Sequence, residues 1–274
     1  LANIYAQNNT RMNLRNRLPG AGGAQASLKT LRLNIRIFSV SNNRSRRALS
    51  IRPVIATGYR PSYMSRKPKP TKGDMENVRR LVLCHSDITD VTFVACLKQL
   101  KFLYLGCNHI TDITPLAGLT QLTYLHLANT HITDVSALEG LKKLNVLFLS
   151  GNQLTDVSAL EGLKQLTDLN LNGNQLIDAS SLAGLTKLKV LYLEDNQLTD
   201  LTPLAGLKKL EVLGLYNNNL TDVGVLAGLM QLKELYLNFN NLTDVSALAR
   251  LTQLKYLFLQ DNPNLTKVEI AKLR

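Results

Sequence analysis

A 22-residue period runs through the second part of the chain and constrains the fold more than any other feature. A Leu-x-Leu pair recurs nine times without an insertion. The pairs begin at Leu81, Leu103, Leu125, Leu147, Leu169, Leu191, Leu213, Leu235 and Leu257. The apolar positions of one unit cannot enclose a core of their own, so neighbouring units must stack on one another.

Two polar columns keep the same period. Asn occupies the position three residues after each Leu pair, except at Ser86 and Thr130. We expect its buried amide to satisfy turn backbone groups, and the Ser86 and Thr130 turns to be looser. Each unit has a segment that leads from its Leu pair back to the start of the next pair. Asp occupies one position of this return segment in every unit from Asp90 to Asp244, where it predicts an N-cap for a short helical turn. Catalysis needs singular residues, so these repeated carboxylates predict architecture and no enzyme.

The segment 152–163, Asn-Gln-Leu-Thr-Asp-Val-Ser-Ala-Leu-Glu-Gly-Leu, resembles the 22-residue repeats of bacterial internalin-like proteins, and so do its sister segments over about residues 78–265. The resemblance implies an α/β fold, a right-handed leucine-rich repeat solenoid or horseshoe. Its concave face is a parallel β-sheet that binds another protein, and its convex face carries short helical or 3-10 turns. The repeats are also similar to those of phosphatase-regulating leucine-rich proteins, which implies an intracellular scaffold as the alternative.

Strand alternation predicts which side chains leave the core toward the concave face. We expect the partner-binding residues to be Phe102, Tyr104, Tyr124, His126, Phe148, Asn170, Tyr192, Glu194, Tyr216, Tyr236, Phe239, Tyr256 and Phe258. Repeated aromatics on a rigid sheet are typical of binding hot spots. The competing interpretation is that Tyr and Phe are good cross-strand neighbours. Acidic and amide residues toward the end of this face favour a partner with basic and apolar groups.

The histidines and cysteines give no metal or cofactor prediction. His85 and Cys107 share one column of adjacent units, and His109 and His131 share another, so each pair should lie close. The chain has no Cys-x-x-Cys or His-x-x-His spacing, and Cys96 aligns with the far limb. We therefore expect ordinary turn and strand residues here, with no metal site and no cofactor. Three cysteines without a disulfide pattern slightly favour the cytoplasm, whereas the resemblance implies the cell surface or secretion.

The net charge of +12 is concentrated in one segment. Residues 1–73 hold 15 Lys and Arg and no acidic residue, whereas the remainder is slightly acidic. This predicts a basic N-terminal extension over 1–73, nine repeats over 74–265 and the start of a C-terminal cap over 266–274. Within the extension, residues 31–38 alternate as a strand does and could cover the first repeat. Its arginines are candidates for contacting nucleic acid or an acidic surface: Arg32, Arg36, Arg44, Arg46, Arg47 and Arg52.

Two other interpretations of residues 1–73 stay open. An arginine-rich, acid-free N-terminus is also typical of an organelle transit peptide. A solvated extension, or translation upstream of the true start codon, is the plainest interpretation. No uninterrupted apolar run reaches the length of a membrane span, and we expect a monomer.

Overall fold

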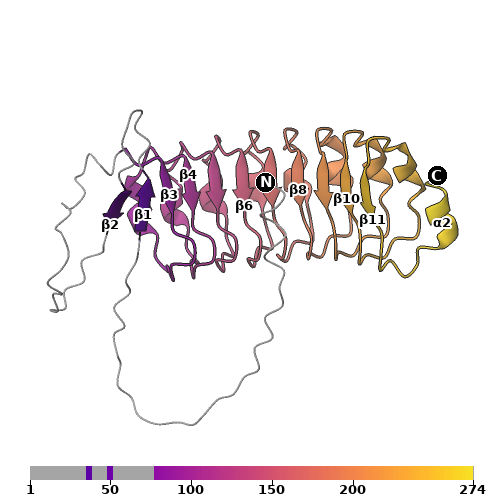
Figure 1. Ribbon diagram of the computed structural model, residues 1–274, viewed down its shortest axis with the longest axis horizontal. Helices are drawn as coiled ribbons and strands as arrows, with labels where there is room; N and C mark the ends of the chain where they lie inside the picture. Colours follow the sequence, from indigo (N-terminus) through magenta and orange to yellow (C-terminus); the bar gives the residue numbers. More distant parts are fainter. Residues whose placement is uncertain (1–34, 39–47, 52–76, 274) are drawn as a thin grey trace, which may run out of the picture. The chain divides into compact units, whose positions relative to one another are not determined.

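One β-sheet organises the molecule. The computed structural model describes residues 35–38, 48–51 and 77–273. In that part, short parallel strands follow one another in chain order (Figure 1). They are β3 (Arg80–Val82), β4 (Phe102–Tyr104), β5 (Tyr124–His126), β6 (Val146–Phe148), β7 (Asp168–Asn170), β8 (Val190–Tyr192), β9 (Val212–Gly214), β10 (Glu234–Tyr236) and β11 (Tyr256–Phe258). The central leucine of each strand lies opposite the central leucine of the next, which confirms the predicted register and the leucine-rich repeat solenoid.

Two antiparallel strands precede this row. β1 (Ile35–Phe38) pairs with β3, and β2 (Ala48–Ile51) pairs with β1. The pairing gives the first repeat strand a partner on its outer edge, as predicted for the segment 31–38, although residues 31–34 lie outside the described part. The sequence analysis missed β2, because four residues are too short a run for alternation to stand out.

The return limb of each unit carries a 3-10 segment. These segments are η2 (Thr92–Cys96), η3 (Thr114–Leu116), η4 (Ser136–Leu138), η5 (Ser158–Leu160), η6 (Ser180–Leu182), η7 (Thr202–Gly206), η8 (Gly224–Gly228) and η9 (Ser246–Arg250). The prediction that the Asp column caps them needs one correction. The N-cap of η3 is Ile113, and Asp112 lies one residue before it, where its Oδ1 accepts the Thr114 N–H at 2.8 Å. The carboxylate closes a local turn one residue earlier than a helix N-cap would.

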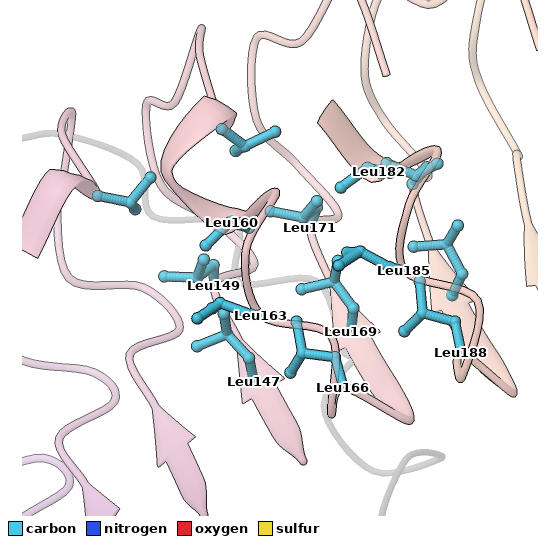
Figure 2. Close-up of a cluster of buried hydrophobic side chains, with 14 of the residues drawn as sticks. Leu147, Leu149, Leu160, Leu163, Leu166, Leu169, Leu171, Leu182, Leu185 and Leu188 are labelled. Atoms are coloured by element: carbon cyan, nitrogen blue, oxygen red, sulfur yellow. The ribbon is translucent and has the colours of Figure 1, made fainter. Parts of the chain in front are cut away.

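The core is a stack of leucine layers between the two limbs. Figure 2 shows Leu147 and Leu169, from β6 and β7, in one cluster with Leu160 and Leu182 from the return limbs. Leu147 and Leu160 are 0% exposed. Burying one leucine contributes about 1.5–3 kcal/mol. Because every unit buries its layer against the next, the strands are held in register by packing as well as by hydrogen bonds.

The Asn column satisfies the turn backbone as predicted. Asn196 Nδ2 donates to the carbonyls of Leu171, Leu193 and Glu194 at 3.0–3.1 Å, and its Oδ1 accepts the Leu176 N–H at 3.0 Å. One amide thus joins two adjacent units.

Thr130 replaces only part of the Asn network. Its Oγ1 donates to the Leu127 carbonyl at 2.7 Å and lies 3.0 Å from Asn152 Oδ1. In this position an Asn Oδ1 would accept from the Ile110 N–H, as Asn152 Oδ1 does from the Ile132 N–H at 2.9 Å. An Asn here would also donate to the Leu105 carbonyl, as Asn152 Nδ2 does to the Leu127 carbonyl at 2.9 Å. The short threonine makes neither contact, so two hydrogen bonds of the column to the preceding unit are missing here.

The C-terminal end is less well covered. Leu254, Leu257 and Leu259 of the last repeat are half-buried, whereas the equivalent leucines of the preceding unit are 0% exposed. The helix α2 (Lys267–Ala271) follows, and Thr266 Oγ1 accepts the Glu269 N–H as its N-cap. In the described part of the chain, no helix is long and apolar enough to cross a membrane.

Candidate functional site

The strand row presents one continuous face away from the core, which we call the sheet face. It has four columns, each with one residue from every unit. Two columns are the first and the third residue of the strands from β3 to β11. The third column lies two residues after the end of each strand, and the fourth is the turn residue directly after that. Strand register places equal positions side by side, so that Tyr192 in β8 lies opposite Gly214 in β9, and Gly214 lies opposite Tyr236 in β10. Every partner-binding residue predicted from the sequence belongs to one of these four columns.

Aromatic rings from β4 to β6 form the first group on the sheet face. The ring centroids of Tyr104 and Tyr124 lie 4.6 Å apart, and those of Tyr124 and Phe148 lie 5.8 Å apart. Phe102 joins them, with the Arg80 guanidinium 4.7 Å from its ring centroid. Such a contact is a cation–π interaction. The sequence analysis missed Arg80, although it shares the column of Phe102 and column comparison could have identified it.

His126 lies within this group. A Cβ at Gly106 would overlap its ring, so the missing side chain of Gly106 makes the space that the imidazole occupies. The ring centroid of His126 is 5.5 Å from that of Phe148. Its Nδ1 is buried without a hydrogen-bond partner among the described residues. Burial lowers the pKa of His126, because the charged form would lose its hydration, and the nearby His85 lowers it further.

A second aromatic group lies on β9 to β11 and their turns. Tyr236 and Phe258 stack with ring centroids 5.0 Å apart and an interplanar angle of 4°. Tyr216 and Phe239 meet edge to face at 5.2 Å. Phe239 is 47% exposed and Tyr256 is 56% exposed. These side chains combine a fixed position with apolar surface that is open to a partner.

Phe239 occupies an unusual backbone position. The turn column has positive φ in every unit. Its members are His85, Cys107, Asn129, Gly151, Gly173, Asp195, Asn217, Phe239 and Asp261. Gly, Asn and Asp adopt this conformation at low cost, whereas a bulky side chain is disfavoured by about 1–2 kcal/mol. Phe239, with φ of 55°, is the largest side chain in this column, and His85 and Cys107 are the other members that are not Gly, Asn or Asp.

Charge divides the sheet face into two halves. From β3 to β6 the columns hold Arg80 and two histidines but no carboxylate. From β7 to β11 they hold carboxylates and no Lys, Arg or His. These acidic residues are Asp168, Glu194, Asp195, Glu234 and Asp261. A partner therefore meets an acidic half and a half without acids.

Glu194 is the most perturbed of these carboxylates. Burial and, to a smaller extent, the neighbouring Asp195 raise its pKa to about 7. Its Oε2 accepts a hydrogen bond from Asn172 Nδ2, and its N–H donates to Asn172 Oδ1 at 2.9 Å. Asn170, another predicted contact residue, is only 8% exposed, and its Oδ1 accepts the Asn172 N–H.

The other predicted groups are placed as follows. The rings of His109 and His131 stack at 5.6 Å, in agreement with their shared column. Among the described residues, no group of three or more His, Cys, Asp and Glu could hold a metal ion. Of the six candidate arginines, only Arg36 lies in a described segment, β1; Arg32, Arg44, Arg46, Arg47 and Arg52 lie outside the described residues.

Comparison with known proteins identifies relatives of the repeat region. A family model described as leucine-rich repeats in two copies matches residues 76–118, 120–162, 142–184, 164–206, 186–228, 208–249 and 231–272. Internalin C2 from Listeria monocytogenes is 40% identical with a TM-score of 0.67, covering 69% of this chain and 84% of that one. A leucine-rich repeat protein of Leptospira interrogans is 27% identical with a TM-score of 0.59, covering 74% of this chain and 60% of that one.

A more distant structure has a bound partner. It is the leucine-rich repeat ectodomain of a plant membrane receptor kinase from Arabidopsis thaliana, in complex with Casparian strip integrity factor 2. It is 25% identical with a TM-score of 0.64, and the match covers 74% of this chain and 26% of that one. A comparison with curated proteins finds no significant match.

Proposed function

Because the chain belongs to the leucine-rich repeat family and its repeats are internalin-like, we propose that it is a non-catalytic module that binds a partner protein through the sheet face. Proteins of this fold generally serve as binding scaffolds. The repeat-wide Asp and Asn columns close turns, which accounts for them without chemistry.

Phe239 is the single observation that carries the proposal. Plain strand propensity explains aromatic residues within β4 to β11, but Phe239 lies in a turn. It keeps a bulky ring where Asn217 stands in the preceding unit, at positive φ and 47% exposed. A residue that costs folding free energy and stays exposed suggests a function outside the fold.

The chemistry of the face suggests the class of partner. Rings at Tyr216, Phe239 and Tyr256 offer apolar area, and the surrounding carboxylates favour basic groups. We therefore expect a protein partner that combines apolar and basic side chains. The complex of the plant receptor ectodomain with Casparian strip integrity factor 2 is consistent with a leucine-rich repeat domain that receives a ligand.

Partner capture tests the proposal. The immobilised chain would be exposed to lysate, captured proteins identified by mass spectrometry, and each affinity measured with the purified partner. Replacing Tyr192 and Tyr236 with Ala should weaken binding about 10-fold or more without unfolding the chain.

The basic extension supplies the competing outcome. A second variant replaces Arg32, Arg36, Arg44, Arg46, Arg47 and Arg52 with Gln. If that variant abolishes capture while the Tyr192 and Tyr236 variant binds normally, the N-terminal arginines carry the interaction. The sheet-face proposal is then wrong.

A further inference from the structure

Gly214, in β9, has no side chain, and the Glu194 carboxylate occupies the space that one would fill; we call this place the Gly214 gap. It lies between Tyr192 and Tyr236 of the neighbouring strands, in a column otherwise filled largely by rings. A Cβ at Gly214 would overlap Glu194 Oε1 and would lie 2.8 Å from Tyr192 Cδ1. The absence of a side chain thus allows the Glu194 carboxylate to sit over the backbone of the next strand, beside an aromatic ring.

Two tyrosines and a second carboxylate surround this gap. The Tyr236 hydroxyl donates to Glu234 Oε2 at 2.9 Å. Burial, the Glu234 carboxylate, and the proximity of Tyr192 and Glu194 raise the pKa of Tyr236, so Tyr236 stays neutral at physiological pH. Gly214 therefore lies among two tyrosines and the carboxyl groups of Glu194 and Glu234.

The Glu194 carboxylate has an amide partner but no cation in the described part of the chain. Two lysines precede the flanking strands, but both turn to Glu211: Lys189 Nζ lies 3.6 Å and Lys233 Nζ 2.5 Å from its carboxylate oxygens. Asp195 accepts from Asn217 Nδ2 at 2.8 Å. A largely buried carboxylate loses hydration, and within a protein such a group is normally matched by a cation.

We propose that Gly214, Glu194, Tyr192 and Tyr236 form a subsite that receives one arginine side chain of the partner protein. A guanidinium is planar, stacks on an aromatic face and donates to a carboxylate in the same plane. Lysine satisfies the charge but neither the stacking nor the fork geometry. The subsite rests on the proposed function, because it specifies which partner group the acidic half of the sheet face takes.

The first experiment uses the full chain and a small probe. The ¹⁵N-labelled protein is titrated with N-acetyl-arginine methylamide, and chemical shifts are followed at the Gly214 amide. N-acetyl-citrulline methylamide, which has the same shape without the charge, is the control ligand. We expect saturable arginine binding with a Kd on the order of 1 mM and no saturation with citrulline.

Two variants and a matched control locate the subsite. Glu194→Gln removes the charge with little change in shape, and Gly214→Ala fills the gap; each should weaken arginine binding about 10-fold or more. Glu161→Gln removes one exposed negative charge on the return limb and should bind as the original chain does. The proposal is overturned if arginine does not bind, if citrulline binds equally well, or if Glu194→Gln leaves the affinity unchanged.

The same variants distinguish this subsite from the broader proposal. If Glu194→Gln binds the purified partner normally while the Tyr192 and Tyr236 alanine variant does not, the arginine subsite is wrong and sheet-face binding stands. If the arginine probe binds at Gly214 but no sheet-face variant changes partner affinity, the site recognises arginine, but the proposed function and the role of the site in partner binding are both wrong.

Discussion

Replacing Phe239 with Asn should stabilise the fold and weaken partner binding at the same time. Asn217 already occupies the equivalent turn of the preceding unit with φ of 51°, so the backbone accepts this residue without rearrangement. Relief of positive φ at a bulky side chain contributes about 1–2 kcal/mol. Loss of the edge-to-face contact with Tyr216, at 5.2 Å, costs about 0.5–1.5 kcal/mol. The net expectation is a variant more stable by about 0–1 kcal/mol.

Binding should change in the opposite direction. An aromatic anchor in a protein interface contributes about 2 kcal/mol or more, so Kd should rise about 30-fold. Urea unfolding measures stability, and surface plasmon resonance with the purified partner measures affinity. Ile177→Thr is the control, because Ile177 is 67% exposed outside the sheet face and Thr stands at this position in the next unit, at Thr199. A Phe239→Asn chain that is less stable by more than about 1 kcal/mol, or that binds unchanged, would refute the reasoning.

Three further predictions concern the polar framework. Thr130→Asn should raise the free energy of unfolding by about 1 kcal/mol, because the new amide supplies an acceptor for the Ile110 N–H. Asn196→Ala should lower it by about 3 kcal/mol by removing four hydrogen bonds, three of them buried, whereas alanine at the exposed Asn219 should change little; urea unfolding measures all three variants. The folded pKa of Glu194, about 7, lies above its ordinary 4.5, so its stabilising contribution is complete below pH 4.5 and is lost as pH rises through 7. Glu194→Gln should remove that loss and be more stable than the original chain by about 1–3 kcal/mol at pH 8, with little difference at pH 4; equal unfolding curves at pH 8 would contradict this.

The sequence predicts the row of parallel strands because residues one 22-residue period apart lie side by side in adjacent strands. Leu103 and Leu125 are 22 residues apart and lie opposite each other in adjacent strands, so reading the period is equivalent to reading the register. With Asp112 as N-cap, the 3-10 segment was predicted to begin one residue too early: its N-cap is Ile113, and Asp112 accepts the Thr114 N–H from the position before it. The residue at which the segment begins depends on how the return limb packs, which the pattern does not specify.

The sequence predicted which residues of the candidate site share a column, but not the contacts and backbone conformations of those residues. Alternation placed Tyr192 and Tyr236 on the outward face. It could not show that the Glu194 carboxylate lies over Gly214 of the next strand. That contact joins two units and is possible only because Gly214 has no side chain. Nor could it show that Phe239 holds positive φ, although comparison of its column with Gly151 and Gly173 would have suggested it.

The division of charge along the sheet face should separate how a partner arrives from how long it stays. Carboxylates on the sheet face act beyond contact distance and are screened over about 8 Å at physiological salt, so they mainly accelerate association. The ring of Phe239 acts only after docking, so its loss should mainly accelerate dissociation. Asp168→Asn together with Asp261→Asn should therefore lower the association rate and its salt dependence, while Phe239→Asn leaves both unchanged. Because the carboxylates occupy only the β7 to β11 half, the same reasoning orients the partner, with its basic end over that half.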